Sequence, residues 1–268
     1  MQTLGVVEDT LFVPMLGRIY ASEHCPQILY DRKTLELKNR LPSDLIKQNM
    51  QNQYTLLASA SRSANMDWFI RSFLERRPDG VIVQLGCGLE TTYHRCDNGK
   101  THWYAVDLPH VIEYRRGLLP EPERECYISG NAFAKDWIKK VRDEVLDTPI
   151  LVIAGGLFHY FEENKVIALL RMIGQFGNME VVFDTVNRKG MAMMQKKYMR
   201  QIGHADAQMF FYVDAVEELA AKIGGNAKVI ADEPYYRYIP KNGLKMSTKV
   251  SMAVSDWFCM VKMIQLKL

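Results

Sequence analysis

The sequence predicts an α/β fold with a doubly wound, mostly parallel sheet. Five short β-rich runs follow one another with helical stretches between them, at 81–85, 101–106, 125–129, 149–154 and 179–186. Strands that alternate with helices indicate parallel strands joined by crossover helices. A long helical region precedes the first run, and two further β-rich runs follow the fifth.

Residues 1–78 are expected to form a helical cap ahead of the sheet. Apolar residues recur there at helical spacing, and three prolines, Pro14, Pro26 and Pro42, are expected to divide the cap into several short helices. The clearest helix spans 54–77 and ends at the Pro-Asp-Gly sequence of 78–80. The cap could close on a ligand as a lid or serve only as scaffold, and the sequence leaves both open.

Residues 79–268 are expected to form the core, so that 1–268 is a single domain. A Met-rich, basic segment at about 187–213 is predicted either to line the acceptor site as an insertion or to form a solvent-facing amphipathic helix. A helix is predicted near 214–223. The last two β-rich runs, 227–231 and 256–266, are predicted to close the sheet as an antiparallel hairpin.

Composition limits the partners and the location. The chain has 268 residues, 34 basic and 31 acidic, and this balance argues against a nucleic-acid partner. The five scattered cysteines form no zinc or redox pair, so we expect reduced thiols and no metal. Because the sequence has neither a signal peptide nor an apolar run long enough to span a bilayer, we expect a cytoplasmic protein without a membrane partner.

Two strand ends carry the chemistry that the residues themselves suggest. The first strand ends in Gly86-Cys87-Gly88, where small residues let the backbone approach a ligand closely. The second strand ends in Asp107, about twenty residues later. A carboxylate at this place can accept hydrogen bonds from both hydroxyls of a ribose. Asp107 could instead cap the helix that begins at Leu108-Pro109.

The glycine turn lacks one feature of the dinucleotide fingerprint. Thr91 occupies the place of the third glycine, which argues against a nicotinamide or flavin dinucleotide. A cofactor without phosphates, such as S-adenosylmethionine, does not need a helix N-terminus open to a pyrophosphate.

Longer segments resemble a known family. These are EDTLFVPMLGRIYASE, RSANMDWFIRSFL, VQLGCGLETTYHRCD, WYAVDLPHVIEYRRGLLP, SGNAFAKDWI and LVIAGGLFHYFEENKVIALLRMI. Together they closely resemble the leucine carboxyl methyltransferase superfamily, in particular its bacterial branch similar to the tetracenomycin polyketide synthesis O-methyltransferase. The resemblance implies a class I, Rossmann-like methyltransferase fold with seven strands, and S-adenosylmethionine as the cofactor, with S-adenosylhomocysteine as the product.

The resemblance also implies roles for single residues. Arg62 matches an arginine that pairs with the carboxylate of the cofactor, although a solvated helix-surface arginine is the alternative. Asn131 and Ala132 match the position that contacts the adenine, where an acid is usual. Gly155 stands where the family generally has a glutamate, so either Asp107 and backbone carbonyls suffice for the cofactor's positive charge or an acid elsewhere compensates.

The expected reaction is in-line methyl transfer to a small-molecule carboxyl or hydroxyl group. A carboxylate needs no base at neutral pH, whereas a phenol or alcohol would benefit from one. The candidate catalytic residues are His159 and Tyr160, and a packing role for His159 is the alternative. The candidate substrate-binding residues are Phe12, Arg18, Tyr20 and His204.

Other functions remain compatible with the sequence. The fold does not fix the acceptor, so N- or S-methylation and methylation of a protein C-terminal carboxylate stay open. Gly155 supports a non-catalytic module that only binds the cofactor. A nicotinamide-dependent oxidoreductase is a third alternative, against which the missing third glycine argues.

Overall fold

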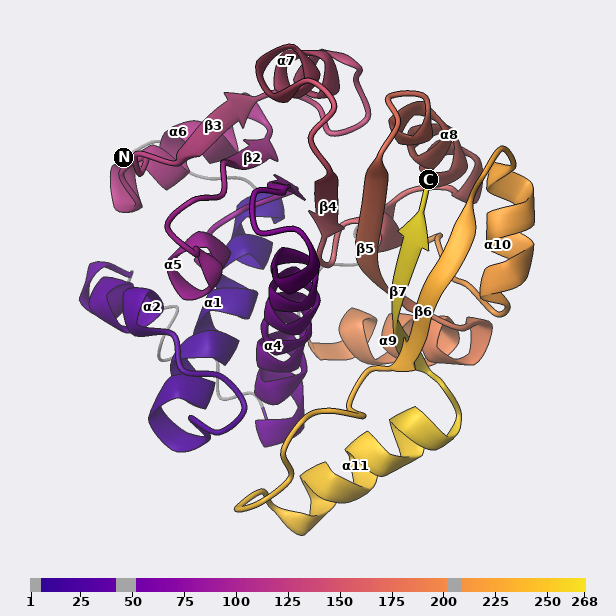
Figure 1. The fold of residues 1–268 in the computed structure, drawn as a ribbon. Coiled ribbons are helices and arrows are strands. Elements are labelled where there is room, and N and C mark those ends of the chain that lie inside the picture. The colour runs from indigo at the N-terminus through magenta and orange to yellow at the C-terminus, as the bar shows by residue number, and fades with distance from the viewer. Residues whose placement is uncertain (1–5, 42–51, 202–208) are drawn as a thin grey trace.

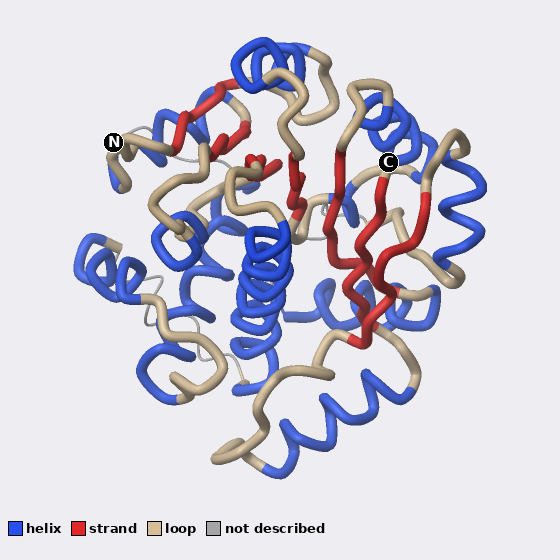
Figure 2. Tube along the Cα trace, in the orientation of Figure 1, coloured by secondary structure: helices blue, strands red, loops and turns tan. Residues whose placement is uncertain are grey.

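The structure is a computed structural model in which residues 6–41, 52–201 and 209–268 are described. Seven strands form one sheet in the order β3-β2-β1-β4-β5-β7-β6 (Figures 1 and 2). The first five strands are parallel and confirm the predicted doubly wound sheet. Their bounds are β1 Val81–Leu85, β2 Trp103–Asp107, β3 Glu125–Ser129, β4 Ile150–Ala154 and β5 Met179–Val186.

The last two strands are antiparallel, as predicted. Strand β7, Val261–Lys267, pairs with β5 on one side and with β6, Lys228–Pro234, on the other. The two are not joined by a tight turn, because helix α11, Met246–Trp257, lies in the connection between them. Strand β6 forms one edge of the sheet, and α11 lies at the lower border of the molecule in Figure 1.

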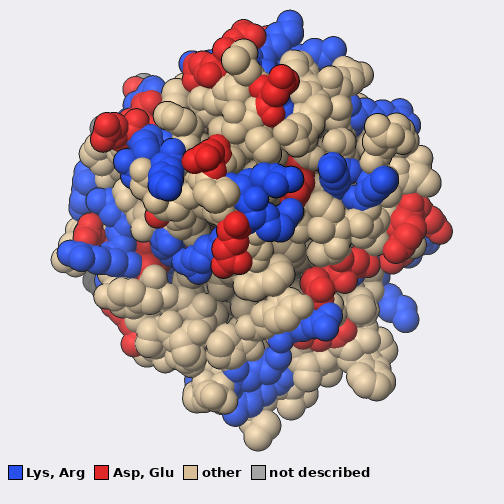
Figure 3. Space-filling model, in the orientation of Figure 1, with Lys and Arg blue, Asp and Glu red and all other residues tan. Residues whose placement is uncertain are grey.

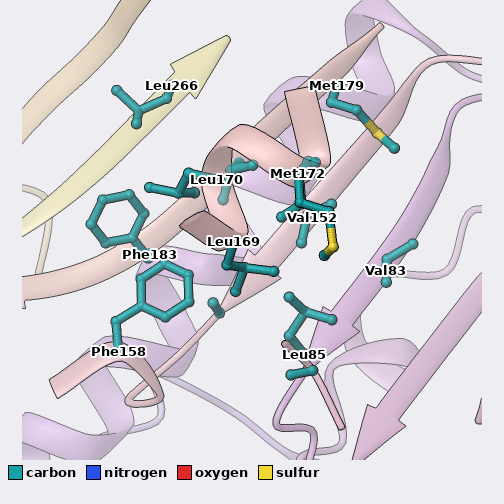
Figure 4. Packing of buried hydrophobic residues seen from close by; sticks show 14 of the residues in the cluster. Val83, Leu85, Val152, Phe158, Leu169, Leu170, Met172, Met179, Phe183 and Leu266 are labelled. Atoms are coloured by element: carbon teal, nitrogen blue, oxygen red, sulfur yellow. The ribbon is translucent and has the colours of Figure 1, made fainter. Parts of the chain in front are cut away.

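Helices cover both faces of the sheet because its strands are apolar on both faces. On one face, Val81, Val83 and Leu85 pack in the same core as α7, Asp136–Val145, α8, Glu163–Gly174, and α10, Val216–Ile223. Figure 4 shows Val83 and Leu85 with Leu169, Leu170 and Met172 of α8. Ile82 points to the other face. That face is covered by α4, Gln53–Arg76, α5, Thr92–Cys96, and α11, while α6, Pro109–Leu118, lies over β2 and β3.

The cap consists of α1, Val6–His24, α2, Arg32–Leu37, the 3-10 turn η1, Lys38–Arg40, and α4. The prediction that Pro14 divides the first helix is wrong, because α1 continues through it. A proline inside a helix removes one backbone hydrogen bond. Phe12, Met15 and Leu16 flank it and are buried in the cap core, so their packing offsets that loss. Pro42 lies outside the described residues.

The Met-rich segment begins as helix α9, Arg188–Gln201, directly after β5. Met191 is buried against Val186 and Met209, whereas Met193 is exposed. The helix therefore has an inward apolar contact at the end of β5 and an outer face in solvent.

Candidate active site

The glycine turn lies at the C-terminal edge of the sheet, beside the point between β1 and β4 where the strand order reverses. Open α/β sheets bind their ligands at this point. Gly86 has φ +62° and Gly88 has φ +45°, both in the left-handed region that glycine adopts without strain. The N–H of Gly86 donates to the carbonyl of Val106 at 2.9 Å, and Cys87 is buried. The turn is thus fixed to β2, and its two glycines carry no side chain.

Asp107 supports this turn with both carboxylate oxygens. Oδ2 accepts from the backbone N–H of Gly88 at 2.8 Å and Oδ1 accepts from the N–H of Leu108 at 2.7 Å. Burial raises the pKa of Asp107 above its ordinary value, and these two hydrogen bonds counteract only part of that effect. The N-cap of α6 is Leu108, which excludes the alternative in which Asp107 is the cap residue. Each oxygen keeps a lone pair for a further donor.

The loop after β3 lies next to Asp107. The N–H of Gly130 donates to the backbone carbonyl of Asp107 at 2.8 Å. Asn131 is exposed, and its Oδ1 accepts from the N–H of Phe133 at 2.9 Å, which shapes the loop. Ala132 is buried, and its carbonyl accepts from the indole of Trp137. The structure therefore brings Asn131 and Ala132 beside the turn and Asp107.

A second group of side chains meets at the ends of β4 and β5. Asp184 on β5 is 3% exposed and lies 3.2 Å from Nε of Arg62, which projects from α4. Its Oδ1 accepts from the N–H of Gly156 at 2.6 Å. Burial alone raises the pKa of Asp184, but the charge of Arg62 and the contacts with His159 and the N–H of Gly156 together outweigh it and hold the pKa below the usual carboxyl range. Asp184 is therefore a carboxylate at neutral pH.

Gly155 and Gly156 make room for the Arg62 guanidinium. A Cβ added at Gly156 would lie 1.8 Å from Nη1 of Arg62, and one at Gly155 would lie 3.3 Å from Cδ of the same side chain. Arg62 thus crosses directly over the backbone that follows β4. Burial lowers the pKa of Arg62, but Asp184, Tyr235 and Tyr160 together more than compensate and the pKa is raised, so the guanidinium stays charged.

The two groups adjoin through Leu157. A Cβ added at Gly86 would lie 3.0 Å from Cδ1 of Leu157, which follows Gly156 in the chain. Gly86, Cys87, Gly88, Asp107 and Leu108 therefore lie on one side of Leu157, and Arg62, Gly155 and Asp184 lie on the other.

His159 and Tyr160 belong to the 3-10 turn η2, Phe158–Tyr160, after β4. His159 is buried, and its Nε2 lies 3.3 Å from Oδ2 of Asp184. A carboxylate acceptor at this distance calls for a proton on Nε2. Nδ1 is buried without a hydrogen-bond partner among the described residues. Tyr160 is half-exposed on the same turn.

Arg18 lies in a buried charge network and not in an open site. Its Nε is 3.2 Å from Asp31, its Nη2 donates to the carbonyl of Leu89 at 2.8 Å, and Nη1 pairs with Glu90. Arg95 bridges Asp31 to Asp67, at 2.8 Å from each. Burial raises the pKa of Asp31, but Arg95 and Arg18 lower it to about 2. The network ties the cap to the loop that follows the glycine turn.

The remaining predicted substrate residues are spread along the cap. Phe12 is buried and packs edge-on against Tyr114 of α6, with ring centroids 6.0 Å apart. Tyr20 lies about two turns further along α1, stacks on His24 and accepts from the amide of Gln53 at 3.1 Å. His204 lies outside the described residues. The structure does not bring Phe12, Arg18 and Tyr20 to one ligand-facing surface.

Sequence reasoning missed three side chains that the structure brings to this edge. Asp184 is one, and the signal for it was the second of two acids in the otherwise largely apolar run MEVVFDTV. The other two are Leu157 and Leu11, whose Cδ2 lies 3.1 Å from a Cβ added at Gly88. Nothing in the sequence distinguishes these leucines from core leucines.

Residues 6–41, 52–201 and 209–268 contain neither a membrane-spanning helix nor a metal-binding cluster. None of the helices in these ranges is long and apolar enough to cross a membrane. These ranges also contain no group of three or more histidines, cysteines or acids placed to hold a metal ion.

Comparison with solved structures agrees with the fold. A DUF574 family protein from Streptomyces avermitilis superposes with a TM-score of 0.62 at 12% identity, over 94% of this chain and 96% of that one. The magnesium protoporphyrin IX methyltransferase of Synechocystis, solved with bound S-adenosylhomocysteine, gives a TM-score of 0.51 at 9% identity, over 88% and 99%.

Comparison of sequences identifies the family. The chain is 30% identical over 182 residues to the tetracenomycin polyketide synthesis O-methyltransferase of Streptomyces glaucescens. This alignment covers 67% of the chain and 66% of that relative, just under two thirds of its length. Residues 8–174 match the family model of leucine carboxyl methyltransferase. This range includes both the glycine turn and the loop after β4. The chain therefore belongs to the leucine carboxyl methyltransferase family.

Proposed function

We propose that this chain is an S-adenosylmethionine-dependent methyltransferase that methylates an oxygen atom of a small molecule. The observation that carries the proposal is the pairing of two groups at one sheet edge, the glycine turn with Asp107 and the Arg62–Asp184 ion pair. Family membership supports it, as does a relative named as a polyketide O-methyltransferase. A protein of similar fold binds S-adenosylhomocysteine.

The residues present fit this cofactor. Its ribose needs an acceptor of two hydroxyl hydrogens, which the Asp107 carboxylate provides while the N–H groups of Gly88 and Leu108 hold it in place. The backbone of Gly86, Cys87 and Gly88 offers a surface without side chains. Leu108, Asn131 and Ala132 flank Asp107 and are the residues that we assign to the adenine.

The amino-acid tail of the cofactor is a zwitterion, and the Arg62–Asp184 pair matches both of its charges. Because Nε of Arg62 faces Asp184, the two terminal nitrogens are the donors that we assign to the carboxylate. Asp184 supplies the negative charge that Gly155 lacks and so compensates for it from the neighbouring strand. In this assignment Gly155 contributes only the space that the Arg62 side chain occupies.

When bound, S-adenosylmethionine supplies an electrophilic methyl group on a sulfonium. The chain's own contribution is to hold an acceptor in line and to exclude water. We assign the exclusion of water to the cap, residues 1–78, because Leu11 of α1 lies against the glycine turn. We assign the acceptor side to the segment at about 187–213, which begins with α9 at the end of β5.

The placement of His159 favours a carboxylate as the acceptor. Its Nδ1 is buried, and its other nitrogen is held by Asp184. A carboxylate is ionised at neutral pH and needs no proton removed, whereas a phenol or alcohol does. We therefore assign His159 to positioning Asp184 and leave Tyr160, at the surface of the same turn, as the residue of η2 that contacts the acceptor.

Labelled S-adenosylmethionine tests the proposal. The purified chain is incubated with the labelled cofactor and a panel of aromatic carboxylic acids, phenols, amines and thiols, and the products are identified by mass spectrometry. We expect either methyl esters, which base hydrolyses, or methyl ethers, which it does not. Asp107→Ala should abolish the formation of both. Transfer only to amines or thiols contradicts the O-methylation, and transfer only to protein in a cell extract identifies a protein carboxyl methyltransferase. Binding of S-adenosylhomocysteine without any transfer indicates a non-catalytic module.

A further inference from the structure

Helix α11 exposes large apolar side chains to solvent from its first turn to its last. Trp257 is 83% exposed and Met246 is 72% exposed, while Val250, Val254 and Phe258 lie between 41% and 54%. The two charged residues from 246 to 259, Lys249 and Asp256, are partly buried, and every exposed position is uncharged. The exposed positions are Met246, Ser247, Val250, Ala253, Val254, Trp257, Phe258 and Cys259. The opposite face, with Thr248, Met252 and Ser255, is buried.

This face is larger than solvent-facing apolar patches usually are. A fully exposed large aromatic side chain presents roughly 150–250 Å². Scaled by their exposed fractions, the five large apolar side chains of this face together expose on the order of 600 Å². The largest apolar patch on a typical monomer is roughly 300–600 Å², and such patches mark interaction sites. Figure 3 shows uncharged side chains at the lower border of the view, interrupted by a group of Lys and Arg side chains.

The spacing of this face is that of two packed helices. Met246, Val250, Ala253 and Trp257 follow one another at intervals of four, three and four residues, which places them on one seam. The pattern is also self-complementary. In an antiparallel pair, Trp257 lies beside the partner's Met246, and the small Ala253 lies beside the partner's Val250.

We propose that α11 forms the interface of a two-fold symmetric homodimer. A closed two-fold contact uses the same patch on both copies, and a seam that matches its own reverse meets this requirement. Together the two patches remove roughly 1,200 Å² from water, the lower limit of stable specific interfaces. Because the interface does not include the glycine turn, Asp107 or Arg62, the dimer does not depend on the proposed methyl transfer.

The position of α11 links this interface to the C-terminal edge of the sheet. The carbonyl of Phe258 accepts from the side-chain amide of Asn187 at 2.8 Å, and the ammonium of Lys189 lies 5.9 Å from the Phe258 ring centroid. Asn187 and Lys189 stand at the start of α9. The dimer would therefore hold the base of α9 in place from outside the monomer.

Analytical ultracentrifugation of the full chain tests the dimer. We expect a reversible monomer–dimer equilibrium whose dissociation constant rises roughly 30-fold or more in Ala253→Arg, because an arginine at the centre of the seam enters the desolvated part of the contact. Ala221→Arg, at an exposed alanine of α10, is the matched control and should leave the constant unchanged. Trp257→Ala should also weaken the dimer while leaving the melting temperature of the monomer unchanged, since the side chain packs on little in the monomer.

Three results would overturn the proposal. A chain that remains monomeric up to about 100 μM lacks a dimer of useful affinity. A dimer that Ala253→Arg and Ala221→Arg weaken equally, or not at all, uses another surface. A patch that binds neutral lipid vesicles while the chain stays monomeric has a membrane as its occupant.

Discussion

Replacement of Asp184 by asparagine tests the link between the β5 acid and the cofactor site. The variant keeps the shape of the side chain and an oxygen for the N–H of Gly156, but it removes the negative charge beside Arg62. Breaking a fully buried ion pair costs roughly 3–5 kcal/mol. Arg62 is 27% exposed, so water replaces part of the lost interaction and we expect a destabilisation of about 2 kcal/mol. At roughly 2–4 °C per kcal/mol, the melting temperature should fall by roughly 4–8 °C.

The effect on ligand binding separates the tail of the cofactor from its nucleoside. S-adenosylhomocysteine has the amino-acid tail, whereas methylthioadenosine lacks it. Titration calorimetry should show that Asp184→Asn weakens S-adenosylhomocysteine roughly 10-fold or more, the loss of one charge-assisted interaction, and leaves methylthioadenosine nearly unchanged.

Glu163→Gln is the control for the loss of a carboxylate from an ion pair. Glu163 and Lys222 pair at 2.6 Å on the surface, where both are about half exposed, so removing this pair should cost less than about 1 kcal/mol. If Asp184→Asn weakens both ligands equally, or neither, the assignment of Asp184 to the charged tail is wrong.

Three further variants examine the glycine loop, the ribose contact and the buried network. Gly156→Ala places a Cβ 1.8 Å from Nη1 of Arg62 and should weaken the binding of S-adenosylhomocysteine roughly 10- to 100-fold. Gly177→Ala is the control, because Gly177 also has a left-handed φ but no neighbour within 4 Å, and it should leave the affinity unchanged. Equal affinities of the two variants would remove Arg62 from the site. Asp107→Ala should weaken both S-adenosylhomocysteine and methylthioadenosine by roughly 10- to 100-fold in calorimetry, and near-normal affinity would refute the ribose contact. Asp31→Asn should cost about 2 kcal/mol at pH 7, because the pKa of Asp31 is lowered to about 2 in the folded chain. A carboxyl whose pKa is lowered by folding stabilises the fold at pH values above its unfolded-state pKa, and this stabilisation is lost as the pH falls through its folded-state pKa. In urea unfolding, the difference in stability between the wild type and Asp31→Asn should therefore shrink as the pH falls from about 4 to about 2. A constant difference would mean that Asp31 acts by packing alone.

The sheet was predictable from the sequence because its strands are short apolar runs with clear breaks. All five parallel strands lie within two residues of the predicted runs, since β-rich segments such as 81–85 end at glycine or aspartate. The helices of the cap were harder to predict, because a single helix-breaking residue does not decide whether a helix ends there. Pro14 lies inside α1 because Phe12, Met15 and Leu16 bury that helix against its neighbours.

The candidate site was predictable where a residue follows a strand and not where side chains from distant elements meet. Gly86, Gly88 and Asp107 follow β1 or end β2, so strand order alone brings them together. Asp184 became visible only through its contacts with α4 and the β4 loop, since strand position gives no hint of a partner more than a hundred residues away. Arg18 was a candidate substrate-binding residue in the sequence, yet its charge is neutralised inside the cap by Asp31 and Glu90.

Isothermal titration of the purified chain with S-adenosylhomocysteine, with NADH as the control ligand, tests the central claim most directly. The glycine turn, Asp107 and the Arg62–Asp184 pair together predict binding of S-adenosylhomocysteine in the micromolar range and no binding of NADH. Failure to bind S-adenosylhomocysteine, or binding of NADH in its place, would contradict the assignment of this sheet edge to S-adenosylmethionine.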